Sequence, residues 1–230
     1  MEINIDEQLL ESQKVDESNS QAILSQVLRI AVYDEFKAYE SYTKIIEKFG
    51  YVTPFVNIRE AEARHYSELI PLLEKYEIDV PINNWAEKVE VPNSFIEACE
   101  LGVASEINNI AMYENLLSYV QEADIRDVLY KLQAASYNKH LPAFRNCVIN
   151  HYTSSSDLNT KGFNQEELMQ KLGEYQSLFE DAMSGNLDQS KLTELFSKLN
   201  ISMISGVAFG GAAIAFLNNY MDNKDKKEKE

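Results

Sequence analysis

Glu62 and His65 are the residues of this sequence whose types and spacing most directly predict chemistry. They stand three positions apart in a stretch over residues 53–76 with helical periodicity, so both side chains point to the same side of the helix. The other residues on that side are apolar and belong in a core: Phe55, Ile58, Leu69 and Leu72. A buried carboxylate is costly unless a cation or hydrogen bonds compensate it. Glu-x-x-His on a core-facing helix is the ligand pattern of carboxylate-bridged di-iron and di-manganese bundles.

Two further helical stretches each carry one acid on an otherwise apolar side, Glu35 in the first and Glu106 in the second. A fourth stretch carries His140 on its apolar side. If neighbouring helices pair antiparallel, these three residues lie close to Glu62 and His65 at the middle of a bundle. The sequence therefore predicts a metal site built from Glu35, Glu62, His65, Glu106 and His140.

These residues need four long helices to position them. The apolar periodicity predicts helices over residues 20–49, 53–76, from Asn93 or Ser94 to a turn near residue 121, and 124–150. Pro142 predicts a kink in the last of them, because it removes one backbone donor and crowds the preceding turn. The architecture expected is an all-α, ferritin-like four-helix bundle with a helical C-terminal extension.

The composition agrees with an all-α protein. The chain has 230 residues, 45% of them hydrophobic, with only 8 glycines and 5 prolines, which allows one sizeable core. The formal net charge of −16 excludes nucleic-acid binding, because no basic field attracts phosphate. Residues 1–20 are acidic and lack an apolar segment, so we expect a cytoplasmic protein without a signal peptide.

The chain divides into five expected segments. They are a flexible N-terminus over 1–19, the bundle over 20–150, a linker with accessory helices over 151–200, an apolar glycine-containing helix over 201–221 and a charged tail over 222–230. Residues 201–217 are apolar apart from serines and glycines, near the lower limit for a membrane span. Two interpretations stay open for this stretch: a membrane anchor, or a helix buried in a homo-oligomer.

Several stretches of residues 28–148 together resemble the ferritin-like superfamily. They are most similar to the bacterial and archaeal family catalogued as domain of unknown function 2202. The matching stretches are Tyr33-Asp34-Glu35-Phe36-Lys37-Ala38-Tyr39, Phe55-x-Asn57-Ile58 with Glu62-x-x-His65, Leu72-Leu73-x-x-Tyr76-x-Ile78 with Pro81, Gly102-x-x-x-Glu106-x-x-x-Ile110, and residues 135–144 around His140.

The resemblance implies a pair of metal ions. One would be bound by Glu35, Glu62 and His65, and the other by Glu106 and a second Glu-x-x-His. The chain departs from this pattern, because Tyr137 stands three residues before His140. Either the second site is weaker, or a tyrosinate or water fills the gap, or one metal binds.

Carboxylate and imidazole ligands suit iron and manganese. The function expected is a non-haem iron protein that oxidises ferrous iron with dioxygen or peroxide. One alternative is a manganese-dependent peroxide scavenger on the same fold. Another is a non-catalytic helical scaffold, tethered to a membrane through 201–217.

Tyrosines and cysteines also accompany the predicted site. Tyr39 and Tyr137 could carry radical or electron-transfer chemistry beside a metal, or could be core aromatics with one polar end. Cys99 and Cys147 are predicted at similar heights on paired helices. They could form a redox disulfide, but we expect two buried thiols.

Overall fold

In a computed structural model of the chain, the described residues are 3–154 and the single residues 170, 173 and 177. The apolar helix expected over 201–221 and the tail over 222–230 lie outside the described residues. The accessory helices expected within 151–200 also lie outside them, apart from residues 151–154, 170, 173 and 177. The described residues form helices and loops, without a strand. No helix among them is both long enough and apolar enough to span a bilayer.

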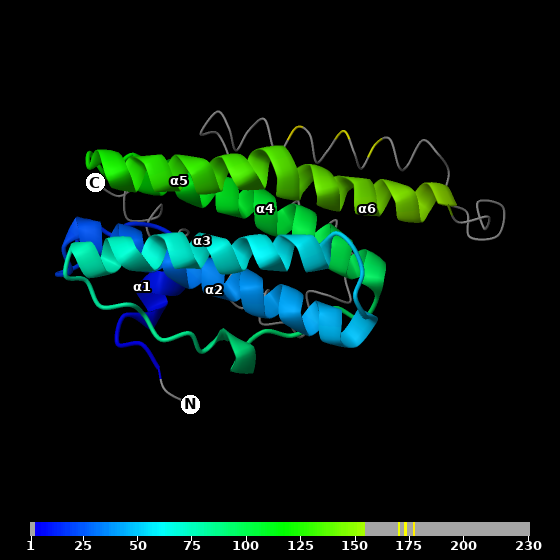
Figure 1. Cartoon of the computed structure of the whole chain (residues 1–230), viewed down its shortest axis with the longest axis horizontal. Coiled ribbons are helices and arrows are strands. Elements are labelled where there is room, and N and C mark those ends of the chain that lie inside the picture. The colour runs from blue at the N-terminus through cyan, green and yellow to red at the C-terminus, as the bar shows by residue number, and fades with distance from the viewer. Residues whose placement is uncertain (1–2, 155–169, 171–172, 174–176, 178–230) are drawn as a thin grey trace, which may run out of the picture.

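Long helices that run side by side carry the architecture (Figure 1). The helices in chain order are α1 (Glu7–Ser12), α2 (Ile23–Phe49), α3 (Phe55–Lys75), α4 (Phe95–Leu117), α5 (Ala123–Ala135) and α6 (Leu141–Ser154), with a short 3-10 turn at Trp85–Glu87 before α4. α2 packs along α3, and α4 packs along α5 and α6. Contacts between α2 and α4 and between α3 and α5 join these two pairs.

The ends of the long helices follow from local chemistry. α2 ends where Gly50 adopts a φ of 91° and donates its N–H to the carbonyl of Ile46 at 2.8 Å, a conformation that glycine adopts without strain. α4 begins after Ser94, whose hydroxyl accepts the N–H of Glu97 at 3.3 Å. The carboxylate of Glu97 in turn accepts the N–H of Asn93, the residue before the cap, at 3.0 Å.

The N-terminal segment corrects the expectation of a flexible 1–19. It contains α1, whose Leu9 and Leu10 are buried in the core. Asp6, just before α1, forms an ion pair with Arg29 of α2 at 2.7 Å. The segment is ordered because it covers the side of α2 that would otherwise expose apolar residues to water.

The predicted fourth helix is interrupted between α5 and α6. Residues Ser136–His140 form a π-helical turn, in which the N–H of Leu141 donates to the carbonyl of Ser136. Pro142 stands one residue beyond this turn, after Leu141, and brings no N–H to the helix ladder. A π-helical turn inserts one extra residue into a helix, so it rotates the side chains that follow. The structure therefore places an irregularity just before Pro142, where the sequence predicts a kink.

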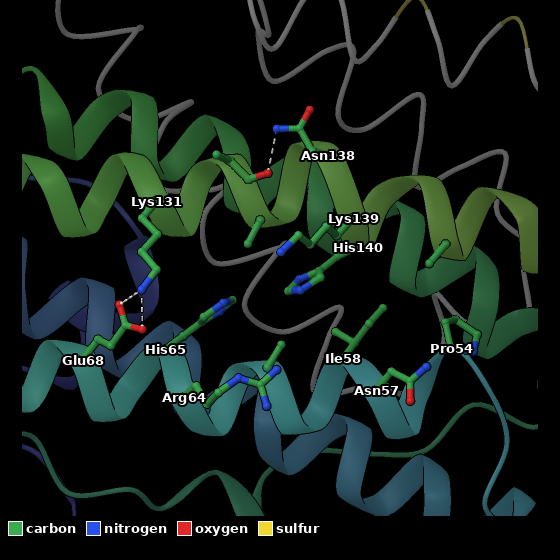
Figure 2. A pocket seen from close by; sticks show the side chains of 14 residues that line it. Pro54, Asn57, Ile58, Arg64, His65, Glu68, Lys131, Asn138, Lys139 and His140 are labelled. Carbon is green, nitrogen blue, oxygen red and sulfur yellow. Dashed lines mark hydrogen bonds and ion pairs between the residues drawn. The ribbon is translucent and has the colours of Figure 1, made fainter.

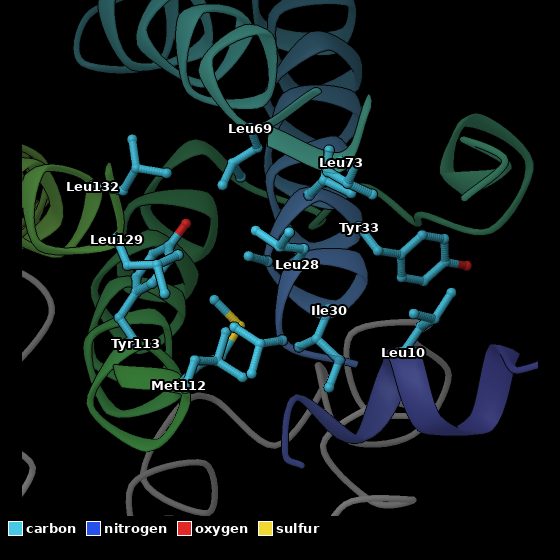
Figure 3. Packing of buried hydrophobic residues seen from close by; sticks show 14 of the residues in the cluster. Leu10, Leu28, Ile30, Tyr33, Leu69, Leu73, Met112, Tyr113, Leu129 and Leu132 are labelled. Carbon is cyan, nitrogen blue, oxygen red and sulfur yellow. The ribbon is translucent and has the colours of Figure 1, made fainter. Parts of the chain in front are cut away.

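Two apolar clusters fill the interior. The first lies among α1, the start of α2, the ends of α3 and α4, and α5; Figure 3 shows Leu28 of α2 on the side of Leu69 and Leu73, and Ile30 on the side of Met112 and Leu10. The second lies among the other ends of α2, α3 and α4, with α6, and includes Phe55, Ile58, Ile107 and Phe144. On α3, Glu62 and His65 fall between Ile58 of the second cluster and Leu69 of the first. A polar layer thus separates two apolar clusters.

A disulfide joins Cys99 of α4 to Cys147 of α6, with 6.0 Å between the two Cα atoms. The expectation of two buried thiols was wrong. Both cysteines lie in one register of the α4–α6 pair, in which Glu106 lies beside His140 and Gly102 packs against Phe144. Cys99 and Cys147 continue this register by one further turn, so their side chains meet.

Candidate metal centre

All five predicted ligand residues come together in the polar layer. Their exposed fractions are 2% for Glu35, 3% for Glu62, 8% for His65, 3% for Glu106 and 3% for His140. They form two groups that could each hold a metal ion, one of Glu35, Glu62 and His65 and the other of Glu62, Glu106 and His140. Within each group, one ligand atom per residue lies within 4.8 Å of the others.

Glu62 belongs to both groups, and its two carboxylate oxygens face different histidines. Oε2 lies 2.7 Å from Nδ1 of His65, and Oε1 lies 3.2 Å from Nδ1 of His140. The two imidazole rings stack with their centroids 5.5 Å apart. A carboxylate between two nitrogen ligands has the geometry to bridge a pair of cations.

Glu35 and Glu106 complete the two groups from opposite helices. Oε2 of Glu35 lies 3.2 Å from Nδ1 of His65, and Oε2 of Glu106 lies 3.6 Å from Nδ1 of His140. Each of these carboxylates also accepts a hydrogen bond from a buried tyrosine. Tyr113 donates to Oε1 of Glu35, and Tyr42 donates to Oε1 of Glu106 at 3.0 Å.

These tyrosines give the centre an approximate two-fold symmetry. Tyr42 follows Glu35 by two turns on α2, and Tyr113 follows Glu106 by two turns on α4. Each helix therefore supplies one carboxylate to its own group and one hydroxyl to the carboxylate of the other helix. Burial and the adjacent carboxylates, Glu106 beside Tyr42 and Glu35 beside Tyr113, raise the pKa of both phenols well above the usual value. Both hydroxyls therefore remain donors.

The titrating groups of the centre share protons. Burial and the neighbouring charge of Glu62 raise the pKa of Glu35 to about 7. Burial alone would lower the pKa values of both histidines, but Glu35 and Glu62 around His65, and Glu106 and Glu62 around His140, outweigh it and raise both to about 10. Burial also opposes ionisation of Glu62, yet the neighbouring His140 and His65 lower the pKa of Glu62. Protons on the histidines thus compensate the carboxylates of the metal-free centre.

The donor set fits metal ions with oxygen and nitrogen ligands. Nδ1 of His140 is buried and has no hydrogen-bond partner within the described chain, although it lies between two carboxylates. The recorded partners of the three carboxylates are histidines and tyrosines; none of the described ion pairs brings Lys or Arg to them. A divalent cation would satisfy the orphaned nitrogen and compensate the buried negative charge.

The other candidates lie away from the ligand groups. Tyr137 is 39% exposed, because the π-helical turn directs His140 inward and Tyr137 outward. Tyr39 is partly exposed and packs edge-on against Tyr66, with 5.7 Å between ring centroids. Glu100, another acid of α4, is buried but belongs to neither group, and Glu114 is exposed.

Sequence reasoning missed a network of hydrogen bonds between polar side chains beside the centre. Asn109 donates to Asp34 at 2.9 Å and accepts from the hydroxyl of Ser136 at 2.8 Å. Gln13, just after α1, donates to the other oxygen of Asp34. This network connects α4, the π-helical turn and the N-terminal segment to Asp34, the residue next to Glu35. Asn109 follows Glu106 by three positions, and that spacing on one helix side was the available signal.

A cleft leads to the two histidines from one side of the molecule. It has a volume of about 720 Å3 and lies between α3 and the helix that runs from α5 through the π-helical turn into α6. Figure 2 shows Arg64 and His65 of α3 across the cleft from Lys139 and His140. A ligand in this cleft would reach the side of the centre formed by the histidines.

The comparisons with known proteins bear on the fold. No family model matches the chain, and no curated protein matches it. The chain is similar to the crystal structure of a hypothetical protein from Methanococcus jannaschii DSM 2661, with a TM-score of 0.52 and 23% identity. The alignment covers 68% of this chain and 95% of the archaeal protein. At this level of identity the likeness shows a shared all-helical fold alone.

Proposed function

We propose that the protein is a ferritin-like four-helix bundle with a dinuclear non-haem metal centre. In this proposal the bundle consists of α2, α3, α4 and the helix from α5 to α6. The observation that carries it is the position of Glu62, whose two carboxylate oxygens face His65 and His140 separately. Each histidine has a further carboxylate of its own, Glu35 or Glu106. In this arrangement Glu62 would bridge two metal ions, and each ion would have one further carboxylate and one histidine of its own.

Iron is the metal that we propose for the centre, with manganese as the alternative that the same ligands accept. Bound iron would supply one-electron chemistry, in which ferrous ions lose electrons to dioxygen or peroxide. A pair of ferrous ions would supply two electrons, which with two protons reduce dioxygen to hydrogen peroxide, or hydrogen peroxide to two water molecules. Glu35, whose pKa is about 7 in the metal-free centre, would release its proton when a cation binds.

The remaining residues of the layer would hold the ligands in position. Tyr42 and Tyr113 fix the orientations of the Glu106 and Glu35 carboxylates through hydrogen bonds. The apolar clusters on both sides of the layer keep bulk water away from the carboxylates. Exclusion of water strengthens the attraction between these carboxylates and a bound cation.

The test is the metal content of the purified full-length protein, measured by mass spectrometry after growth with iron and manganese. Glu62→Gln removes the shared carboxylate, and Glu60→Gln is the matched control, because Glu60 is an exposed acid of the same helix. About two equivalents of metal in the wild type and in Glu60→Gln, with loss in Glu62→Gln, are expected. Iron would support ferrous oxidation, and manganese would support peroxide removal.

Circular dichroism of each variant checks that the helices remain folded. A metal content well below one equivalent in the wild type, with the same content in Glu62→Gln, would refute the metal centre. That outcome would favour a helical scaffold without redox chemistry.

A further inference from the structure

The cleft that reaches His65 and His140 has the size of a small-molecule site. Its volume of about 720 Å3 falls within the range of ligand pockets, roughly 300–1,000 Å3. Ferrous ions and dioxygen need far less space. The cleft is therefore large enough for an organic ligand.

The walls of the cleft are mainly apolar. The lining includes Pro54, Ile58, Ala61, Ala134 and Ala143. Alanines on both facing helices leave the space open, because their side chains end at Cβ. An aliphatic chain would displace water from these walls, which is favourable in proportion to the apolar area covered.

Three cations line the same cleft, and two of them form no ion pair among the described residues. Lys131 is already compensated, because it forms an ion pair with Glu68 at 2.6 Å. Arg64 and Lys139 face each other from opposite helices, and no ion pair of the described chain includes either of them (Figure 2). In a protein of net charge −16, two uncompensated cations at one cleft form a local site for an anion.

We propose that the cleft binds an organic carboxylate with an aliphatic body of medium length. Arg64 and Lys139 hold its carboxylate, and Ile58 and the alanines contact its chain. The guanidinium of Arg64 can donate two parallel hydrogen bonds to a carboxylate. The assignment deepens the proposed function and rests on it for one point, namely that the bound molecule lies beside a metal centre.

The probe for this site is octanoate, titrated into the full-length protein by calorimetry and by ligand-observed NMR. Octanol and inorganic phosphate are the matched ligands, since the first keeps the chain without the charge and the second keeps the charge without the chain. We expect octanoate to bind at least about tenfold more tightly than either, because it alone satisfies both the cations and the apolar walls.

Four variants locate the site. Arg64→Gln and Lys139→Gln are each expected to weaken octanoate binding about five- to tenfold, through the loss of a charge-assisted hydrogen bond. Lys131→Gln should change it less than about twofold, because Glu68 already compensates this lysine. Lys75→Gln removes the same charge from α3 outside the cleft, and should have no effect.

A filling substitution tests the shape of the cleft without altering charge. Ala134→Phe places a ring in the space while leaving the metal ligands intact, and should abolish octanoate binding. Equal binding of octanoate by the wild type, Arg64→Gln and Ala134→Phe would overturn the proposal. Binding of octanol as tight as that of octanoate would overturn it too.

The proposed metal centre is assessed separately in the same samples. Chelator-treated protein that still binds octanoate in an Arg64-dependent manner would support the cleft even if no metal is found. Protein that holds two equivalents of metal but does not bind octanoate would refute the cleft alone. Metal content itself should be the same in wild type, Arg64→Gln and Lys139→Gln, because neither residue belongs to a ligand group.

Discussion

The hydroxyl of Tyr42 on α2 lies 3.0 Å from Oε1 of Glu106 on α4. The reverse relationship also holds, because Tyr113 of α4 donates to Glu35 of α2. Each tyrosine therefore orients a carboxylate that also faces a histidine. Because each hydrogen bond crosses between α2 and α4, the distance between these two helices affects the positions of both the Glu35 and the Glu106 carboxylates.

Removal of either tyrosine hydroxyl should weaken the binding of the metal ion that the adjacent carboxylate would hold. Residues that hydrogen-bond to a metal ligand typically contribute 10- to 100-fold to affinity. Tyr42→Phe and Tyr113→Phe are each expected to lower the affinity of one of two metal equivalents by about tenfold, measured by calorimetry with Mn2+. Tyr66→Phe is the control, because Tyr66 packs against Phe36 and Tyr39 outside the ligand groups. Unchanged affinity in both variants would contradict this role.

The metal-free protein should lose stability as the pH rises. His65 and His140 hold their protons up to a pKa of about 10 in the folded state, against about 6.5 for an unperturbed histidine. The stability that they contribute is complete below pH 6.5 and is lost as pH rises through 10. Glu35, with a raised pKa of about 7, adds a loss of the same sign between pH 4.5 and 7.

The measurement is thermal unfolding in the presence of a chelator. We expect a Tm lower by at least about 5 °C at pH 9.5 than at pH 6.5, because each pKa unit corresponds to about 1.4 kcal/mol. The variant with both His65→Gln and His140→Gln controls for surface groups and should show a smaller decrease. A Tm that stays constant or rises with pH in the wild type would contradict the proton sharing. Added metal should stabilise the protein more at high pH, since fewer protons must then leave the ligands.

The ligand residues were predictable because burial is costly for charge. Glu35, Glu62 and Glu106 each interrupt an apolar helix side, and such an interruption is visible in the sequence. The sharing of Glu62 between two groups was not predictable. Antiparallel pairing of ordinary α-helices places a residue near Tyr137 opposite Glu106, whereas the π-helical turn brings His140 there.

The N-terminal segment shows a second limit of sequence patterns. α1 has only six residues, too few for an apolar period to stand out against its acids. Its order depends on contacts of Leu10 with α2 and of Gln13 with Asp34, which are distant in the sequence. The pairing of Cys99 with Cys147 depends in the same way on a separation between helices, and sequence gives only their approximate heights.

Gly102 should resist substitution although it lies within a helix. A Cβ on Gly102 would overlap the ring of Phe144, which is fully buried against Tyr42 and Phe55. Gly→Ala inside a helix ordinarily stabilises by about 1 kcal/mol. Gly102→Ala is instead expected to destabilise by about 1–3 kcal/mol through overpacking, measured by urea unfolding. Phe144→Leu should relieve the overlap, so Gly102→Ala made in that background should cost less; an equal cost in both backgrounds would refute the contact.

The disulfide between Cys99 and Cys147 should stabilise the fold and fix the α4–α6 register at the centre. It closes a loop with a sequence separation of 48, and crosslinks of this kind contribute about 2–4 kcal/mol by restricting the unfolded chain. Reduction is therefore expected to lower the free energy of unfolding by about that amount, measured by urea titration with and without a phosphine reductant. The double variant Cys99→Ala with Cys147→Ala is the control, and the reductant should leave its stability unchanged. Alkylation of two thiols in the unreduced, denatured protein would contradict the pairing, because a disulfide leaves neither sulfur free to react.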